Sequence, residues 1–190
     1  MDTPVLRLFA ALILIYLASF STSQASLIVP VGFHRMSTSA HTIVAGMVRS
    51  QHTYWDQGRI YTDITLETME FLKHPDADRP QEIVVTLLGG EVGDTRMDVS
   101  GSPTLFKGQE VVLFLMRHNE KYTVFGLSYG LCHVAIDPAT DTQMVYGPVF
   151  QTRTFQNIPQ TKSISLNPLP PQGEELHSFF KRIRMELNTP

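Results

Sequence analysis

The sequence predicts a mostly β fold, a small antiparallel barrel with one C-terminal amphipathic helix. Short segments of strand-forming residues follow one another with turn signals between them, which is typical of a barrel or a sandwich. Helical periodicity is confined to the last part of the chain. Hydrophobic residues make up 43% of the 190 residues and charged residues 17%, so the chain can bury a core.

A signal peptide is predicted at residues 1–25, with cleavage before Ser26. A basic start precedes the apolar run Leu8–Phe20, and Ser23 and Ala25 occupy the small-residue positions ahead of the cut. The apolar run is shorter than the roughly 20 residues that span a bilayer. We therefore expect a secreted or periplasmic protein with no membrane attachment after cleavage.

The rest of the chain divides into four segments by composition. Residues 26–40 form a lead-in with one short turn of helix, and residues 41–152 form the barrel domain. Residues 153–172 form a proline-containing linker, and residues 173–188 form the C-terminal helix. This plan leaves room for one domain with a terminal helix and excludes a second enzyme-sized domain.

The first strands are predicted from residue type and alternation. Thr42–Val48 is rich in strand formers, and Gly46 marks a bulge or a close backbone approach. Ile60–Glu67 alternates between apolar and polar residues, as a half-buried strand does. Beyond it the apolar positions switch to Met69 and Phe71, so we expect a bulge that reverses the faces of the strand.

Further strands follow a proline-containing loop. Val111–Met116 is apolar at every position, which predicts a strand covered on both faces. The long stretch Gly89–Gly108 reads as irregular, with one short strand at Met97–Val99. The remaining strands are expected at Glu82–Leu88, Tyr122–Leu127, Leu131–Ile136 and Met144–Phe150.

The C-terminal helix has an apolar stripe that we expect to pack on the barrel. Binding to a membrane surface is the alternative for a basic amphipathic helix. The stripe is formed by Leu176, Phe179, Phe180, Ile183 and Leu187.

Composition and cysteine use narrow the possible functions. The formal net charge is -3, without the basic excess of a nucleic-acid-binding surface, so nucleic acid is not an expected partner. Cys132 is the only cysteine, so no internal disulfide can form. A reactive or metal-binding thiol is one interpretation of Cys132, and a small buried side chain is the one we favour.

The sequence lacks the motifs of metal and cofactor sites. Its seven histidines show no zinc-binding spacing, and its acidic pairs do not fit an EF-hand loop. No phosphate loop or dinucleotide fingerprint occurs. We therefore expect no metal site and no cofactor, and weak binding of calcium by an acidic pair is the alternative that stays open.

One segment matches a hydrolase motif. Gly126–Gly130 has the pattern G-x-S-x-G, and Asp141 and His177 follow Ser128 in the order of a serine hydrolase. That motif needs a helix directly after the serine, whereas another strand is expected here. We interpret the segment as a turn between two glycines and expect no enzyme activity.

Two segments are candidates for partner binding. The connection expected over His52–Gly58 carries neighbouring aromatic residues, and Gly89–Gly108 is the longest loop in the barrel domain. Aromatic residues and long loops on a rigid scaffold often contact partners. The alternative for the aromatic pair is that it covers the end of the barrel. The site residues expected to do so are Tyr54, Trp55, Glu91, Asp94 and Arg96.

Several segments together carry a resemblance to a known family. They are Thr42–Val48, Gly58–Thr62, Glu70–Lys73, Gly89–Gly93, Gly101–Leu115 and Tyr122–Leu127. Their order resembles a family of exported bacterial proteins in which a similar β-domain stands alone or beside a matrixin-like metalloprotease domain. It is also distantly similar to the OB-type barrel of netrin-like metalloprotease-inhibitor modules. The expected mature end, Ser26, departs from the inhibitor pattern, which has an amino-terminal cysteine that chelates zinc.

From these observations we expect an exported, non-enzymatic binding module of OB-like form. Its partner would be another protein or a cell-surface polymer. The alternative is an accessory to, or an inhibitor of, an exported metalloprotease. A serine hydrolase that uses Ser128 is a further alternative.

Overall fold

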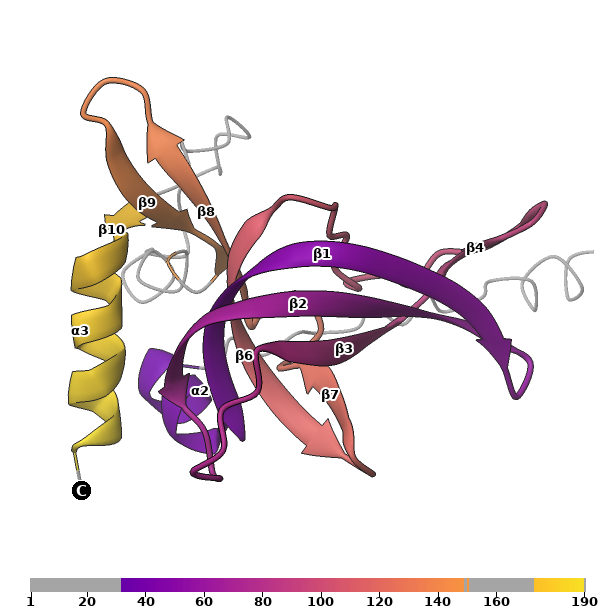
Figure 1. Ribbon diagram of the computed structural model, residues 1–190, viewed down its shortest axis with the longest axis horizontal. Coiled ribbons are helices and arrows are strands. Elements are labelled where there is room, and N and C mark those ends of the chain that lie inside the picture. The colour runs from indigo at the N-terminus through magenta and orange to yellow at the C-terminus, as the bar shows by residue number, and fades with distance from the viewer. Residues whose placement is uncertain (1–31, 149, 151–172, 190) are drawn as a thin grey trace, which may run out of the picture. The chain divides into compact units, whose positions relative to one another are not determined.

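A barrel of five strands forms the centre of the computed structural model, which describes residues 32–148, 150 and 173–189 (Figure 1). The predicted fold class, a mostly β barrel of OB-like form with a C-terminal helix, is confirmed. The predicted signal peptide and proline-containing linker lie outside the described residues. The elements in chain order are α2 (Phe33–Ser39), β1 (Thr42–Asp56), β2 (Arg59–Lys73), β3 (Glu82–Leu88), β4 (Gly90–Val92), β5 (Thr95–Met97), β6 (Glu110–His118), β7 (Lys121–Val124), β8 (Leu131–Asp137), β9 (Thr142–Tyr146), β10 (Gly173–Glu175) and α3 (Leu176–Leu187).

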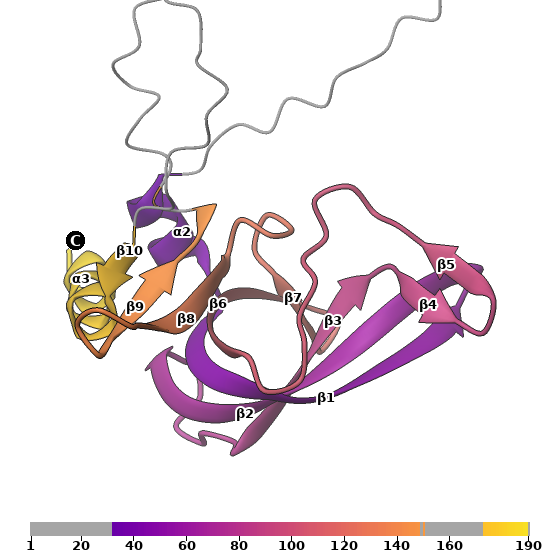
Figure 2. The same ribbon diagram turned by 90° about the horizontal axis from the view of Figure 1, so that it is seen from above.

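The barrel closes through strands that are far apart in the sequence. Its strand order is β1-β2-β3-β7-β6, and β6 pairs back onto β1 to complete the ring (Figure 2). The pairs are antiparallel except β3 with β7, which run parallel and meet at Val85 and Tyr122. OB-type barrels are five-stranded Greek-key barrels that are partly open. Here the opening lies at the pair β3–β7, which meets at one position only.

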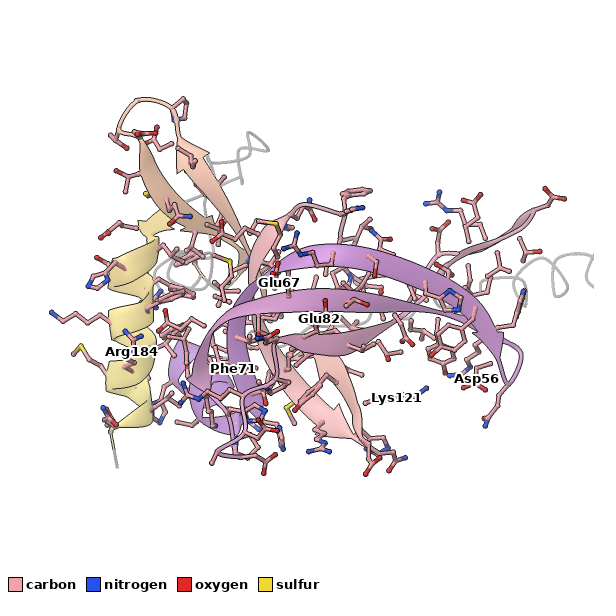
Figure 3. All side chains as sticks on the ribbon, in the orientation of Figure 1. Asp56, Glu67, Phe71, Glu82, Lys121 and Arg184 are labelled. Carbon is pink, nitrogen blue, oxygen red and sulfur yellow. The ribbon has the colours of Figure 1, made fainter. Side chains whose placement is uncertain are left out.

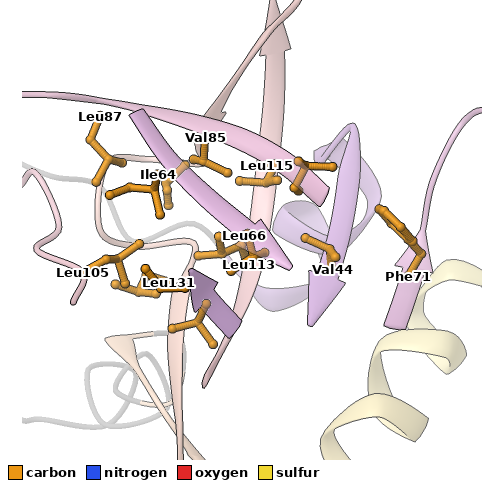
Figure 4. Close-up of a cluster of buried hydrophobic side chains, with 14 residues drawn as sticks. Val44, Ile64, Leu66, Phe71, Val85, Leu87, Leu105, Leu113, Leu115 and Leu131 are labelled. Atoms are coloured by element: carbon orange, nitrogen blue, oxygen red, sulfur yellow. The ribbon is translucent and has the colours of Figure 1, made fainter. Parts of the chain in front are cut away.

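Strand β6 is covered on both faces, as its apolar sequence predicts. Val111, Leu113 and Leu115 point into the barrel and join the core drawn in Figure 4. Val112 and Phe114, on the opposite face, belong to a second core outside the barrel. Because side chains alternate along a strand, one short apolar run supplies both cores.

The second core lies between the barrel wall and the two helices. The rings of Phe33, Phe114 and Phe179 meet there, with centroids 5.8 to 6.3 Å apart. The Arg182 guanidinium lies 3.8 Å from the centroid of the Phe33 ring and pairs with Glu174 at 2.5 Å. The apolar stripe of α3 therefore packs on the barrel as expected.

The C-terminal segment begins with a strand, where the sequence predicts helix from residue 173. Gly173–Glu175 pair with β9 as strand β10, and α3 starts only at Leu176. Strands β8, β9 and β10 extend the sheet from β6 and carry it toward α3 (Figure 1). The lead-in, expected to hold one turn, contains the seven-residue helix α2.

The predicted bulge in β2 is confirmed. The pairing with β1 skips Met69, because Ala45 pairs with Glu70 and Gly46 pairs with Thr68. A Cβ atom on Gly46 would lie 2.3 Å from the Glu67 carbonyl oxygen, so the two backbones approach closely there. Of the two apolar residues after the bulge, Phe71 is buried, whereas Met69 is 58% exposed.

The expected connection over His52–Gly58 is mostly strand. β1 continues to Asp56, and the turn consists only of Gln57 and Gly58, with φ of 47° and 76°. Positive φ at both turn residues matches the two-residue hairpins whose twist suits paired strands. The hairpin β1–β2 therefore projects beyond the closed part of the barrel (Figure 2).

We predict that Phe114→Ala lowers the free energy of unfolding by about 3 to 5 kcal/mol, because a fully buried ring is lost from the second core. Urea unfolding followed by circular dichroism measures the change. Met69→Ala is the matched control, since Met69 is 58% exposed and its truncation should change stability by less than about 0.5 kcal/mol. Equal losses for the two variants would contradict the two-core description.

We predict that Cys132 reacts slowly with thiol reagents in the native protein and rapidly in urea. Its side chain is fully buried, and burial raises the pKa of its thiol to about 12. In the unfolded chain the thiol has a pKa of about 8.5. Burial of the neutral thiol therefore stabilises the folded protein fully below that pH, and this stabilisation is lost as the pH rises toward 12. A Cys132→Ala protein should lack this part of the alkaline loss, and rapid native labelling would contradict the assignment.

Candidate functional site

A polar groove of about 370 Å³ opens beside the projecting part of the β1–β2 hairpin. One wall is the inner face of the hairpin, with Gln51, Thr53 and Thr62. The other wall is the segment that runs from the end of β3 through the β4–β5 hairpin to Leu105. The groove is thus framed by the barrel on one side and by the predicted long loop on the other.

Two consecutive glycines let the chain leave β3 and form the groove. Gly89 and Gly90 have φ of 103° and 135°, which favour glycine. A Cβ atom on Gly90 would lie 2.4 Å from Thr62 Oγ1 and 2.7 Å from Thr53 Cγ2. Thr62 also donates a hydrogen bond of 2.7 Å to the Gly89 carbonyl oxygen. This turn therefore holds the β4–β5 hairpin in close contact with β1 and β2.

The second half of the long loop is tied down by side chains. Ser102 donates a hydrogen bond of 2.7 Å to the Leu88 carbonyl oxygen, and the Gln51 amide donates to the Leu105 carbonyl oxygen. The Leu105 side chain is 2% exposed and fills the barrel core (Figure 4). The stretch predicted as irregular is therefore held in place by these contacts. It includes the hairpin β4–β5, in which β5 is Thr95–Met97.

Charged residues form the rim of the groove. Glu91 and Arg96 pair across the β4–β5 hairpin, and both line the groove. Arg96 Nε donates to Asp98 Oδ1 at 2.8 Å, and this hydrogen bond raises the pKa of Arg96. Asp94 is exposed in the turn of the hairpin and does not line the groove.

Tyr54 and Trp55 lie on opposite faces of β1. Trp55 pairs with Ile60, follows the groove residue Thr53 on the same face, and is 51% exposed at the end of this row. Tyr54 pairs with Tyr61 on the outer face of the hairpin. The structure therefore brings Trp55, but not Tyr54, to the side of the groove.

Several groove residues are absent from the predicted site. The extension of β1 would have placed two of them, Gln51 and Thr53, because residues two apart in a strand share a face and both precede Trp55 at that spacing. The polar character of this segment was instead interpreted as a connection. The groove residues that sequence reasoning missed are Gln51, Thr53, Thr62, Asp98 and Ser102.

Ser128 lies in a tight turn rather than before a helix. Gly126 and Leu127 have φ of 58° and 61°, and the Ser128 N–H donates to the Gly101 carbonyl oxygen at 2.9 Å. Strand β8 then begins at Leu131. The helix that a nucleophile elbow requires does not follow.

Metal-binding and membrane-spanning features were sought in the described residues. Over this part of the chain, no three side chains of His, Cys, Asp or Glu gather as metal ligands. Of the two described helices, neither has the length and apolarity to cross a bilayer.

No family model, curated protein or solved structure matches this chain. The resemblance to exported bacterial β-domains is not tested by these comparisons and stays an expectation.

We predict that Gly130→Val destabilises the protein by about 1 kcal/mol or more, whereas Ser128→Ala leaves stability nearly unchanged. A Cβ atom at Gly130 would lie 2.8 Å from the Phe114 carbonyl oxygen and 3.0 Å from Phe125 Cβ. The Ser128→Ala change keeps the backbone hydrogen bond to Gly101. Thermal unfolding of both variants tests this, and a larger loss for Ser128→Ala would contradict it.

Proposed function

We propose that this protein is an exported, non-enzymatic binding module whose groove beside the β1–β2 hairpin holds a segment of a protein or a cell-surface polymer. The observation that carries the proposal is the groove itself, which is open and polar, with one wall formed by the paired strands β1 and β2. Binding sites are concave surfaces with a few placed polar groups. Export is the expectation from the N-terminal sequence.

The construction of the groove supports binding rather than chemistry. Gln51 and Thr62 donate hydrogen bonds to backbone carbonyl oxygens of the opposite wall, and Ser102 donates one to the Leu88 carbonyl oxygen within that wall. These side chains hold the wall in place and are not arranged as a nucleophile with an adjacent base. The groups left for a partner are the exposed rim charges and the end of the hairpin.

The rim offers contacts of both charge signs and one large aromatic side chain. Glu91 and Asp98 are exposed acidic residues beside the guanidinium of Arg96. Trp55 stands at the hairpin end and is 51% exposed. Tryptophan and arginine are the side chains that most often dominate binding energy at interfaces.

We predict that Trp55→Ala weakens partner binding about tenfold or more and costs less stability than Phe114→Ala. Replacing Glu91–Arg96 with a short glycine link should weaken binding similarly, because it removes one wall and its charges. The measurement compares binding of the mature protein to a purified cell-wall polymer fraction, to exported proteins separated by size, and to an exported metalloprotease.

Met69→Ala is the matched control, because Met69 is exposed outside the groove. Binding that is indifferent to both groove changes would overturn the site. Inhibition of the metalloprotease, lost on the same changes, would favour the inhibitor alternative over a structural binding role.

A further inference from the structure

A row of aromatic rings lies on the outer face of the β1–β2 hairpin, opposite the groove. The rings of His52 and Tyr54 stack with centroids 5.7 Å apart and planes 17° apart. The rings of Tyr54 and Tyr61 stack across the two strands at 6.2 Å and 27°. The row follows from strand geometry, since His52 and Tyr54 are two residues apart and Tyr54 pairs with Tyr61.

A chain of hydrogen bonds holds the middle ring in place. Tyr54 Oη donates to Asp63 Oδ1 at 3.3 Å, and the same carboxylate oxygen accepts a bond of 2.6 Å from Thr86 Oγ1. Lys121 Nζ donates to Tyr54 Oη at 3.5 Å. The Tyr54 ring is therefore oriented before any ligand arrives.

Polar groups frame the rings on two sides. Lys121 Nζ lies 5.9 Å from the centroid of the Tyr54 ring and 6.0 Å from that of Tyr61. Lys121 directly follows the turn between β6 and β7, and its side chain extends toward the end of β1 at Asp56 (Figure 3). A ligand on the rings would meet the ammonium of Lys121, the carboxylate of Asp63 and the imidazole of His52.

In the described part of the structure, the aromatic row is accessible to solvent. His52 and Lys121 are exposed, and Tyr54 and Tyr61 are half-buried. Flat, partly apolar rings next to hydrogen-bonding groups suit a sugar, whose C–H faces pack on aromatic rings while its hydroxyl groups donate and accept hydrogen bonds. OB-type barrels bind oligosaccharides and oligonucleotides through the face of their second and third strands and through two connecting loops.

Charge distinguishes these two ligand classes. On the face of the rings, Asp56 and Arg59 pair across the two strands next to Tyr54 and Tyr61, which adds one charge of each sign to those of Asp63 and Lys121. Glu67 lies farther along β2 and pairs with Arg49. A nucleic acid needs several unmatched cations along its phosphates, whereas the cations described at the rings, Lys121 and Arg59, are matched by Asp56 and Asp63. The described ring face therefore lacks the cationic excess that a polyanion needs, and a neutral polymer does not need it.

We propose that the aromatic row His52, Tyr54 and Tyr61, with Asp63 and Lys121, binds an uncharged polysaccharide chain. This surface is separate from the groove and does not depend on what the groove binds. Because Tyr54 and Trp55 face opposite ways, each surface can be disabled alone.

The test uses isothermal titration calorimetry of the mature protein with cellohexaose, chitohexaose and xylohexaose, which are neutral, and with heparin and single-stranded DNA, which are anionic. At least one neutral oligosaccharide should bind. Tyr61→Ala should raise its Kd about tenfold, the loss expected for one stacked ring. His52→Ala, at an exposed position, should also raise the Kd and leaves folding unaffected.

Two controls separate this surface from the rest. Val84→Ala changes an exposed side chain of the neighbouring strand β3, and Trp55→Ala changes the groove side. Both should leave the Kd for the oligosaccharide unchanged. The sole tryptophan, Trp55, should keep its fluorescence when sugar binds, because it lies on the other face.

The proposal is overturned if no neutral oligosaccharide binds up to millimolar concentration, or if heparin or DNA binds the same residues more tightly. It is also overturned if Trp55→Ala abolishes sugar binding while Tyr61→Ala and His52→Ala do not. Failure of the groove proposal would appear separately, as partner binding that is indifferent to Trp55→Ala.

Discussion

The burial of both faces of β6 is the constraint on which the described structure depends. Residues 111–115 are fully buried, with Val111, Leu113 and Leu115 inside the barrel and Val112 and Phe114 outside it. The same strand pairs with β1 along one edge and with β8 and then β7 along the other. One strand thus closes the barrel, starts the β8–β9–β10 extension and provides part of the surface on which α2 and α3 pack.

This arrangement gives β1 and β2 apolar layers on both faces at one end only. Val44 and Val48 pack inside the barrel, and Ile43 and Ala45 pack under the helices. Beyond Ser50 the outer face of the hairpin carries the aromatic row and charged residues, whereas the inner face still buries Ile60 and Ile64 and meets the groove and the β4–β5 hairpin. A hairpin that is anchored at its base can present side chains on its outer half without disturbing the core.

The sequence predicted the parts of the fold that depend on burial. The apolar run of β6, the bulge after Thr68 and the stripe on α3 were all readable because burial leaves a periodic pattern. The outer half of β1 was not readable as strand, since Ser50–Asp56 is polar or aromatic on both faces. Placing Tyr54 and Trp55 in one site followed from that error, and the polar walls of the groove were missed because their pairing joins segments far apart in the sequence.

The alternation of side chains explains why neighbouring residues serve different surfaces. Tyr54 must face outward if Trp55 faces the groove, so a slip of one residue in the β1–β2 register would exchange the aromatic row with the groove wall. The turn at Gln57 and Gly58 fixes the register at the tip, and the close approach at Gly46 and the bulge at Met69 fix it near the base. Because both ends are specified, the hairpin has one register, and Tyr54 and Trp55 keep their separate faces.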